Sequence, residues 1–124
     1  MSDDQQTLWG LVYKTLKPKA TDASPNACLN RLTNERLSGV PCVYLNEKTA
    51  VVRRAHWSTE GLSALDRKHK RMHDFEDDRP IVVVEYRGRK ILIDGNHRVT
   101  RWLTTHAVKR HEVLLITPRD DNDS

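Results

Sequence analysis

The segment Ile91-Leu92-Ile93-Asp94-Gly95-Asn96-His97-Arg98-Val99 joins a predicted strand directly to a predicted helix. Its first three residues form an apolar run of the kind that fills a buried strand. Gly95 then permits a turn and a close approach of the backbone that a side chain would block. From Val99 onward, apolar residues recur at helical spacing. The segment therefore predicts a domain in which a helix starts at the end of a strand.

The start of this helix is a candidate anion site. The first amides of a helix have no acceptor within the helix, and the helix dipole adds partial positive charge there. His97 and Arg98 place side-chain donors beside those amides, and Arg101 lies on the same face as Arg98. Asn96 is suited to capping the helix or to donating its amide to an anion. The alternative is an ordinary turn in which Asn96 is the N-cap and His97 and Arg98 lie on the surface.

Helices and strands are predicted on both sides of this segment. The predicted helices cover 4–17, 26–37, a run from Ser58 through His69, and 96–106; the predicted strands cover 40–45, 50–54, 81–86, 91–94 and 112–117. Ser58 is the clearest helix start, because the polar residues that follow it match a capping pattern. Residues 87–90 are typical of a tight hairpin turn. This order predicts an α/β fold, α+β in its details, with a small mixed sheet and packed helices.

The composition fits one domain of 124 residues, with 37% hydrophobic and 31% charged residues. The longest apolar runs have four residues, far short of the roughly 18 that a membrane-spanning helix needs. The N-terminus is acidic where a signal peptide would be basic. Cys28 and Cys42 form neither a CxxC pair nor half of a zinc site. We therefore expect a cytoplasmic protein with reduced thiols and no membrane partner.

The net charge of +4 is unevenly distributed. Six Lys or Arg residues and two acids lie between Arg53 and His73, and seven Lys or Arg residues and one acid lie between Arg87 and Arg110. Two basic segments in one small domain favour an anionic partner, either a nucleotide phosphate or a nucleic acid. The alternative is a well-solvated surface of mixed charge.

From about Ala50 to Pro118 the chain resembles the ParB/sulfiredoxin-like fold. The resemblance rests on the strand that starts Pro80-Ile81-Val82-Val83, the hairpin after it, and the box Asp94-Gly95-Asn96-His97-Arg98 that opens a helix. In that family the box binds the phosphates of a nucleotide: ATP in sulfiredoxin, CTP in chromosome-partition proteins, ADP or ATP in free-serine kinases. The resemblance implies an N-terminal helical elaboration over 1–49, a nucleotide-binding core over 50–118 and a disordered acidic tail over 119–124.

The resemblance also implies roles for individual residues. Gly95, His97 and Arg98 would bind phosphate, with Asn96 and Arg101 beside them. The preceding helix would add weaker phosphate contacts from Ser63, Arg67, Lys68 and Arg71. Glu60, Asp94 and His97 are the candidate catalytic residues. Glu60 would be a general base in the manner of the kinases, and Asp94 would orient His97 or hold a metal-bound water. Their alternative roles are structural, with Glu60 at the helix cap and Asp94 accepting N–H bonds in the turn.

Two features separate the chain from named members of that family. Sulfiredoxin has a catalytic cysteine where this chain has Asn96, so sulfinic-acid reduction is not expected. No helix-turn-helix segment follows the box, so centromere partition is not expected either. We therefore predict a stand-alone nucleotide-binding domain, with hydrolysis, phosphoryl transfer or nuclease activity as open possibilities. The alternative is a non-catalytic DNA- or RNA-binding accessory or regulatory protein that uses its basic face.

Metal ligands are weakly indicated. His69 and His73 have the i, i+4 spacing of a helical metal site, but no third ligand accompanies them and the flanking residues are cationic. Four acidic side chains come after His73 and could hold Mg²⁺ beside a nucleotide: Asp74, Glu76, Asp77 and Asp78. A solvated acidic loop is the alternative, and we assign no residue as a metal ligand.

Overall fold

The computed structural model describes residues 3–36, 44–68 and 70–119. Their elements are, in chain order, α1 (Asp3–Thr15), α2 (Pro25–Arg36), β1 (Ala50–Ser58), α3 (Thr59–Leu62), β2 (Ile81–Tyr86), β3 (Arg89–Asp94), α4 (Asn96–Thr104) and β4 (Arg110–Pro118). The strands form a mixed sheet in the order β1-β4-β2-β3. β4 is antiparallel to β1 and parallel to β2, and β2 is antiparallel to β3. The predicted α+β fold with a small mixed sheet is confirmed.

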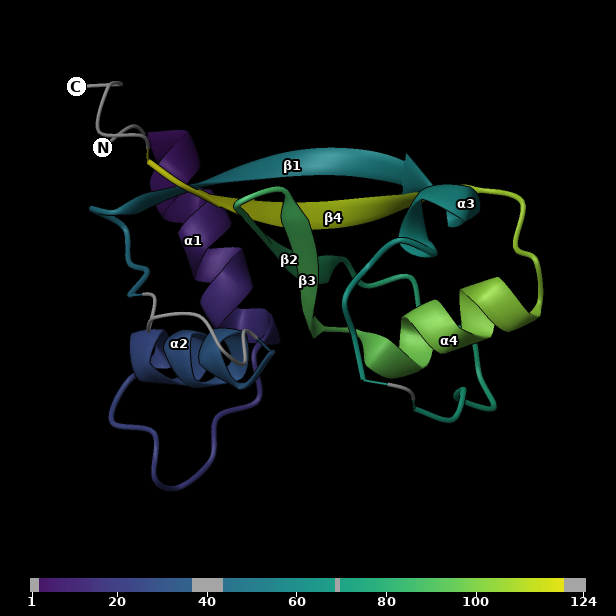
Figure 1. The fold of residues 1–124 in the computed structure, drawn as a ribbon, viewed down its shortest axis with the longest axis horizontal. Helices are drawn as coiled ribbons and strands as arrows, with labels where there is room; N and C mark the ends of the chain where they lie inside the picture. Colours follow the sequence, from purple (N-terminus) through teal and green to yellow (C-terminus); the bar gives the residue numbers. More distant parts are fainter. Residues whose placement is uncertain (1–2, 37–43, 69, 120–124) are drawn as a thin grey trace.

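Helices cover both faces of the sheet, with α1 and α2 on one side and α3 and α4 on the other (Figure 1). All four residues from Ile81 to Val84 are buried, because alternate side chains of β2 enter different cores. Val82 and Val84 pack with Trp9 and other residues of the α1 and α2 side, and Ile81 and Val83 pack with the α4 side. Each buried aliphatic side chain contributes about 1.5–3 kcal/mol. Helices α1 and α2 therefore share a core with the strands rather than forming a separate unit.

The hairpin between β2 and β3 turns on Arg87 and Gly88. Both residues have positive φ, 50° and 78°, as the two central residues of a type I′ turn require. The predicted strand at 81–86 is confirmed, and β3 starts two residues before the predicted strand, at Arg89.

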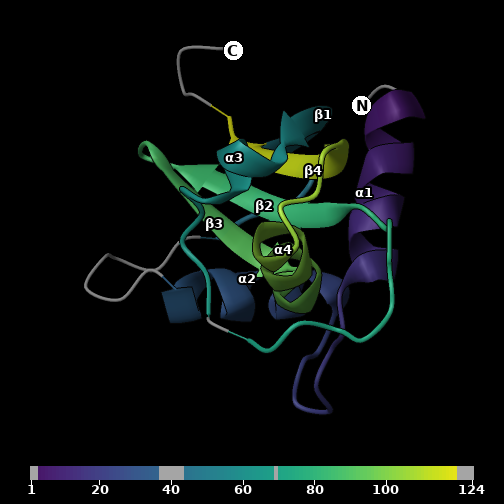
Figure 2. The ribbon, with the colours of Figure 1, turned by 90° about the vertical axis from the view of Figure 1, so that its right-hand side faces the viewer.

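The predicted helix through the basic run is wrong. Ser58 caps α3 as expected, with its Oγ accepting a bond from the Gly61 amide at 3.4 Å, but the helix ends at Leu62. The chain then becomes extended because Asp66 bonds to β3. Its amide donates to the Lys90 carbonyl and its carbonyl accepts from the Leu92 amide, both at 2.8 Å. Residues 63–68 and 70–80 instead form a loop that runs around α4 (Figure 2).

The first strand of the sheet is longer than predicted. β1 covers Ala50–Ser58 and pairs with β4 along its whole length. The side-chain amide of Gln5 extends the pairing at its outer edge, with bonds of 2.7 Å to the Val52 carbonyl and 3.0 Å from the Val52 amide. Of the strand predicted at 40–45, residues 40–43 lie outside the described residues, and Tyr44 and Leu45 are not in a strand. The predicted tail lies outside them beyond Arg119.

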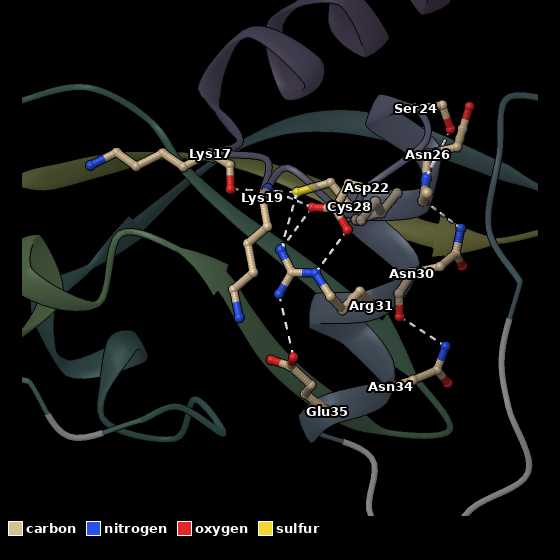
Figure 3. A network of polar contacts seen from close by, with 12 residues as sticks. Lys17, Lys19, Asp22, Ser24, Asn26, Cys28, Asn30, Arg31, Asn34 and Glu35 are labelled. Atoms are coloured by element: carbon tan, nitrogen blue, oxygen red, sulfur yellow. Dashed lines mark hydrogen bonds and ion pairs between the residues drawn. The ribbon is translucent and has the colours of Figure 1, made fainter.

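An ion pair fixes the connection between α1 and α2 (Figure 3). Arg31 of α2 donates to both carboxylate oxygens of Asp22, at 2.9 and 3.0 Å. Cys28 is buried beneath them, and burial raises the pKa of its thiol, so it stays protonated. Cys42 lies outside the described residues. The side chain of Lys17 extends away from this network.

Within the residues that the structure describes, no helix is both long enough and apolar enough to cross a membrane.

Candidate functional site

A cavity of about 200 Å³ lies at the start of α4. It combines residues of the predicted box with residues from the end of α1 and from the loop before β2. Its lining consists of Lys17, Lys70, His73, Arg79, Ile93, Asp94, Gly95, Asn96, His97 and Arg98. Four of these side chains are cationic and one is a carboxylate, so we call this cavity the cationic pocket. Opposite charge makes an anion its natural ligand.

Gly95 gives the pocket its backbone shape. It has a φ of 110°, and a Cβ at this position would lie 2.5 Å from Cγ2 of the buried Ile81. Only glycine fits this conformation and this contact without strain. Gly95, and not Asn96, is the N-cap of α4, and no described side chain caps the helix there. The first amides of the helix therefore remain available to an acceptor at this end.

Arg98 is a buried residue, with only 4% of its surface exposed. Its guanidinium donates to the carbonyls of Arg79 and Pro80, at 2.7 and 2.8 Å, and to the Asp94 carboxylate, at 2.7 Å. A second carboxylate, that of Asp77, lies 4.0 Å from its Nε. Arg98 lines the pocket, but these bonds join α4 to the start of β2 and to the end of β3. Its main role in this geometry is to position the surrounding residues.

His97 presents one ring nitrogen to the protein. Its Nδ1 lies 2.6 Å from the Arg71 carbonyl, which only accepts hydrogen bonds, so Nδ1 carries the proton. The other nitrogen, Nε2, is then a lone-pair acceptor in the neutral ring and a donor in the imidazolium. The His97 ring packs on that of His73, with ring centres 4.6 Å apart. Desolvation first, and the imidazole of His97 second, lower the pKa of His73.

Other polar side chains of α4 bind the backbone and side chains of the loop. Arg101 donates to the His73 carbonyl at 3.0 Å, and Thr100 accepts from Arg67 at 2.9 Å. Together with the His97 contact to Arg71, these bonds hold the loop against the helix. The loop thereby brings His73 and Lys70 to the pocket.

The remaining charges of the pocket differ in how far they are paired. Arg79 donates to both carboxylate oxygens of Asp77, and this guanidinium lowers the pKa of Asp77 to about 2. Lys17 and Lys70 are exposed where they line the cavity. The Oδ1 of Asn96 is buried and has no hydrogen-bond partner among the described residues. Lys17 and Lys70 are thus the cations best placed to meet a ligand.

The structure brings some of the predicted site residues together and separates others. Asp94, Gly95, Asn96, His97 and Arg98 meet in the pocket. Arg67, Arg71 and Arg101 do not line the pocket, and the bonds above join them across the contact between α4 and the loop. Ser63 ends α3 and donates to the Glu60 carbonyl at 2.7 Å, and Lys68 is exposed.

The candidate base Glu60 lies in a different cavity. That cavity has about 480 Å³ and is formed by the start of α3 and the residues after α4, including His106 and Lys109. None of the described cavities is lined by both Glu60 and His97. The structure therefore places Glu60 apart from the residues that line the cationic pocket. The Asp94 carboxylate accepts a hydrogen bond from Arg98 at the start of α4, whereas the cavity that contains Glu60 lies at the other end of that helix.

Sequence reasoning did not place five of the lining residues at this site: Lys17, Lys70, His73, Arg79 and Ile93. Lys70 and His73 lie in the basic run, directly beyond the segment from Ser58 through His69 for which the sequence predicts a helix. Lys17 lies two residues after the end of α1, and no local pattern connects it with the box. It also missed His111, which is 2% exposed, stacks on Trp102 at 4.0 Å and lies 2.8 Å from the Thr59 hydroxyl.

Metal ligands do not gather in the described part of the chain, where no group of three His, Cys, Asp or Glu residues is close enough to hold an ion. His69 lies outside the described residues, so the predicted His69/His73 pair is not described. In the acidic stretch, Asp77 is paired with Arg79, and Asp78 with Lys109.

Comparisons with known proteins add no relative: no family model matches the chain, and no curated protein or solved structure matches it.

Proposed function

We propose that this protein binds the phosphate groups of a nucleotide in the cationic pocket at the start of α4. The observation that carries the proposal is the convergence of Lys17 and Lys70, two exposed cations distant in sequence, on the uncapped helix start at Gly95. Backbone amides, lysine ammonium groups and an imidazole are the donors that bind phosphate oxygens. The resemblance to the ParB/sulfiredoxin-like fold, which stays a prediction, points to the same ligand class.

The roles within the site differ from those predicted from the box alone. His97 meets the ligand through Nε2, since its Nδ1 is bonded to the loop. Arg98 donates to the Asp94 carboxylate and to the Arg79 and Pro80 carbonyls, so its role is to position the turn at the helix start. Small-molecule pockets commonly measure about 300–1,000 Å³, whereas this one has about 200 Å³. It therefore suits the phosphate end of ATP, ADP or CTP, with Mg²⁺ bound by the phosphates, rather than the whole nucleotide.

The proposal concerns binding, and it extends to turnover only through His97. Its Nε2 is an imidazole nitrogen without a hydrogen-bond partner among the described residues, so it is the candidate group for accepting or donating a proton at a bound phosphate. Whether the bound phosphate is hydrolysed or transferred is measured by incubating the protein with ATP or CTP and Mg²⁺ and following phosphate release.

Calorimetry tests the binding. The parent chain is titrated with ATP, ADP, CTP and tripolyphosphate, and the same titrations are run on Lys17→Ala and Lys70→Ala. Lys48→Ala is the matched control, because Lys48 is an exposed lysine in the turn before β1, outside the pocket lining. Each pocket variant should bind about fivefold more weakly, which corresponds to ~1 kcal/mol for an exposed ion pair. Lys48→Ala should bind like the parent.

Duplex and single-stranded DNA are the comparison ligands. A nucleic-acid interface would show tight binding at low salt that falls steeply as salt rises. Equal losses for Lys48→Ala and Lys17→Ala would show general electrostatic attraction and contradict a defined pocket. Absence of binding to all four phosphate compounds would overturn the proposed function.

A further inference from the structure

An exposed aromatic ring stands beside the cationic pocket. Phe75, the chain's single phenylalanine, is 57% exposed although it is among the most apolar side chains. Its ring stacks on that of His73, with centres 4.8 Å apart and planes inclined by 24°. His73 in turn packs on His97, and both histidines line the pocket. Three rings thus form a stack that leads from the phosphate-binding side of the pocket to an aromatic face in solvent.

This stack is held in place by bonds to the helix. Arg101 donates to the carbonyl of His73 itself, and His97 donates to the carbonyl of Arg71. Asp77, which lies two residues after Phe75, is fixed by its bonds with Arg79. The ring of Phe75 therefore lies between two anchored points of the loop. A surface that is ordered before the ligand arrives loses little conformational entropy on binding.

We propose that Phe75 is the platform on which the base of a bound nucleotide stacks while its phosphate groups occupy the cationic pocket. This inference rests on the proposed function and names its ligand class as nucleoside phosphates rather than inorganic phosphate compounds. The pocket is too small for a whole nucleotide, so the base must lie outside it, and Phe75 is the apolar surface next to the phosphate subsite. Aromatic side chains beside a cationic groove are the usual means of holding bases.

The platform also predicts the selectivity of the site. Stacking is tolerant of base identity, because every base has a π face. ATP and CTP should therefore bind with similar affinities, with ATP favoured by its larger ring. Both should bind more tightly than tripolyphosphate, which carries the same phosphate chain without a base.

The test compares these three ligands by calorimetry on the parent chain and on Phe75→Ala, Phe75→Trp and Met72→Ala. Met72 is the matched control, an apolar side chain of the same loop that is 38% exposed. Phe75→Ala should bind ATP and CTP about 5- to 150-fold more weakly, the range measured for loss of one base–aromatic stack, and should bind tripolyphosphate as the parent does. Phe75→Trp should retain ATP affinity, and Met72→Ala should change nothing.

The outcomes separate this inference from the proposed function. If tripolyphosphate and ATP bind equally well to the parent, or if Phe75→Ala leaves ATP affinity unchanged, the platform is wrong and the phosphate pocket stands. If Phe75→Ala weakens tripolyphosphate as much as ATP, the ring serves the fold of the loop and not the base. If none of the three ligands binds the parent, the proposed function and the platform fail together.

Discussion

Replacing Gly95 with alanine perturbs the backbone on which the cationic pocket is built. At its φ of 110°, an L-residue is strained by roughly 1–2 kcal/mol. The new Cβ would also lie 2.5 Å from Cγ2 and 3.1 Å from Cβ of Ile81. Ile81, the first residue of β2, is fully buried in the core on the α4 side of the sheet, so relieving this overlap means shifting a packed core, at a cost of about 1–3 kcal/mol. Gly95→Ala should therefore reduce the free energy of unfolding by about 2–5 kcal/mol.

Gly88→Ala is the matched control for backbone strain alone. Gly88 also has a positive φ, 78°, but no described atom outside its chain neighbours lies within 4 Å of the position that its Cβ would take. Its substitution should cost only the conformational strain, about 1–2 kcal/mol. Urea denaturation of both variants gives the two free energies from midpoints and slopes.

The comparison has a clear way to fail. If Gly95→Ala costs no more than Gly88→Ala, the contact with Ile81 is not restrictive and the steric part of the reasoning is refuted. A double-mutant cycle sharpens the test, because Ile81→Ala removes the Cγ2 atom at 2.5 Å. In that background Gly95→Ala should cost less than in the parent, with a coupling energy of about 1–2 kcal/mol.

Three further variants probe the buried charges. Arg98→Leu leaves the partly buried Asp94 carboxylate without its guanidinium partner, so urea denaturation should show a loss of about 2–4 kcal/mol; a loss under about 1 kcal/mol would contradict the buried pair. Burial lowers the pKa of His111 from its usual 6.5, so the unfolded chain takes up a proton at a higher pH than the folded chain does. Stability should therefore fall as the pH drops below about 6.5, and it should fall less steeply in His111→Gln. Arg31 lowers the pKa of Asp22 to about 2 from 3.8, so the stability that this pair contributes should persist above about pH 4 and be lost toward pH 2. Asp22→Asn should therefore lose less stability on acidification, as measured by unfolding followed by circular dichroism.

The part of the fold that the sequence predicts well is local. The strand at 81–86, the hairpin turn after it and the helix that starts at Asn96 appear where the apolar runs and the glycines indicate them. Each of these features depends on residues only a few positions apart. The two faces of β2 also follow from its uninterrupted apolar run, since a strand buried on both sides needs no polar alternation.

The features that the sequence does not predict depend on contacts between segments distant in the chain. The basic run has the composition of a helix, but the backbone of Asp66 pairs with β3 and keeps the chain extended. Lys17 enters the candidate site from the end of α1, and its position follows from the packing of α1 on the sheet and not from its neighbours in sequence. Its position at the helix start predicts Arg98 at a phosphate or on the surface. In the structure Arg98 is buried, because its carbonyl partners come from a loop whose path the sequence does not specify.

The cationic side chains of the box are therefore not the ones that are most available to a ligand. Arg98 and Arg101 donate to carboxylate and carbonyl oxygens of the protein, and His97 uses one of its two nitrogens in the same way. These bonds place the loop, and the loop supplies Lys70 and His73 to the pocket. Under the proposed function, the helix start would therefore act on a phosphate group in two ways. It would act directly through its first amides and the Nε2 of His97, and indirectly by holding in position Lys70, which lies outside the box. Because the indirect part is set by internal hydrogen bonds, anion affinity and loop order should rise and fall together in variants of α4.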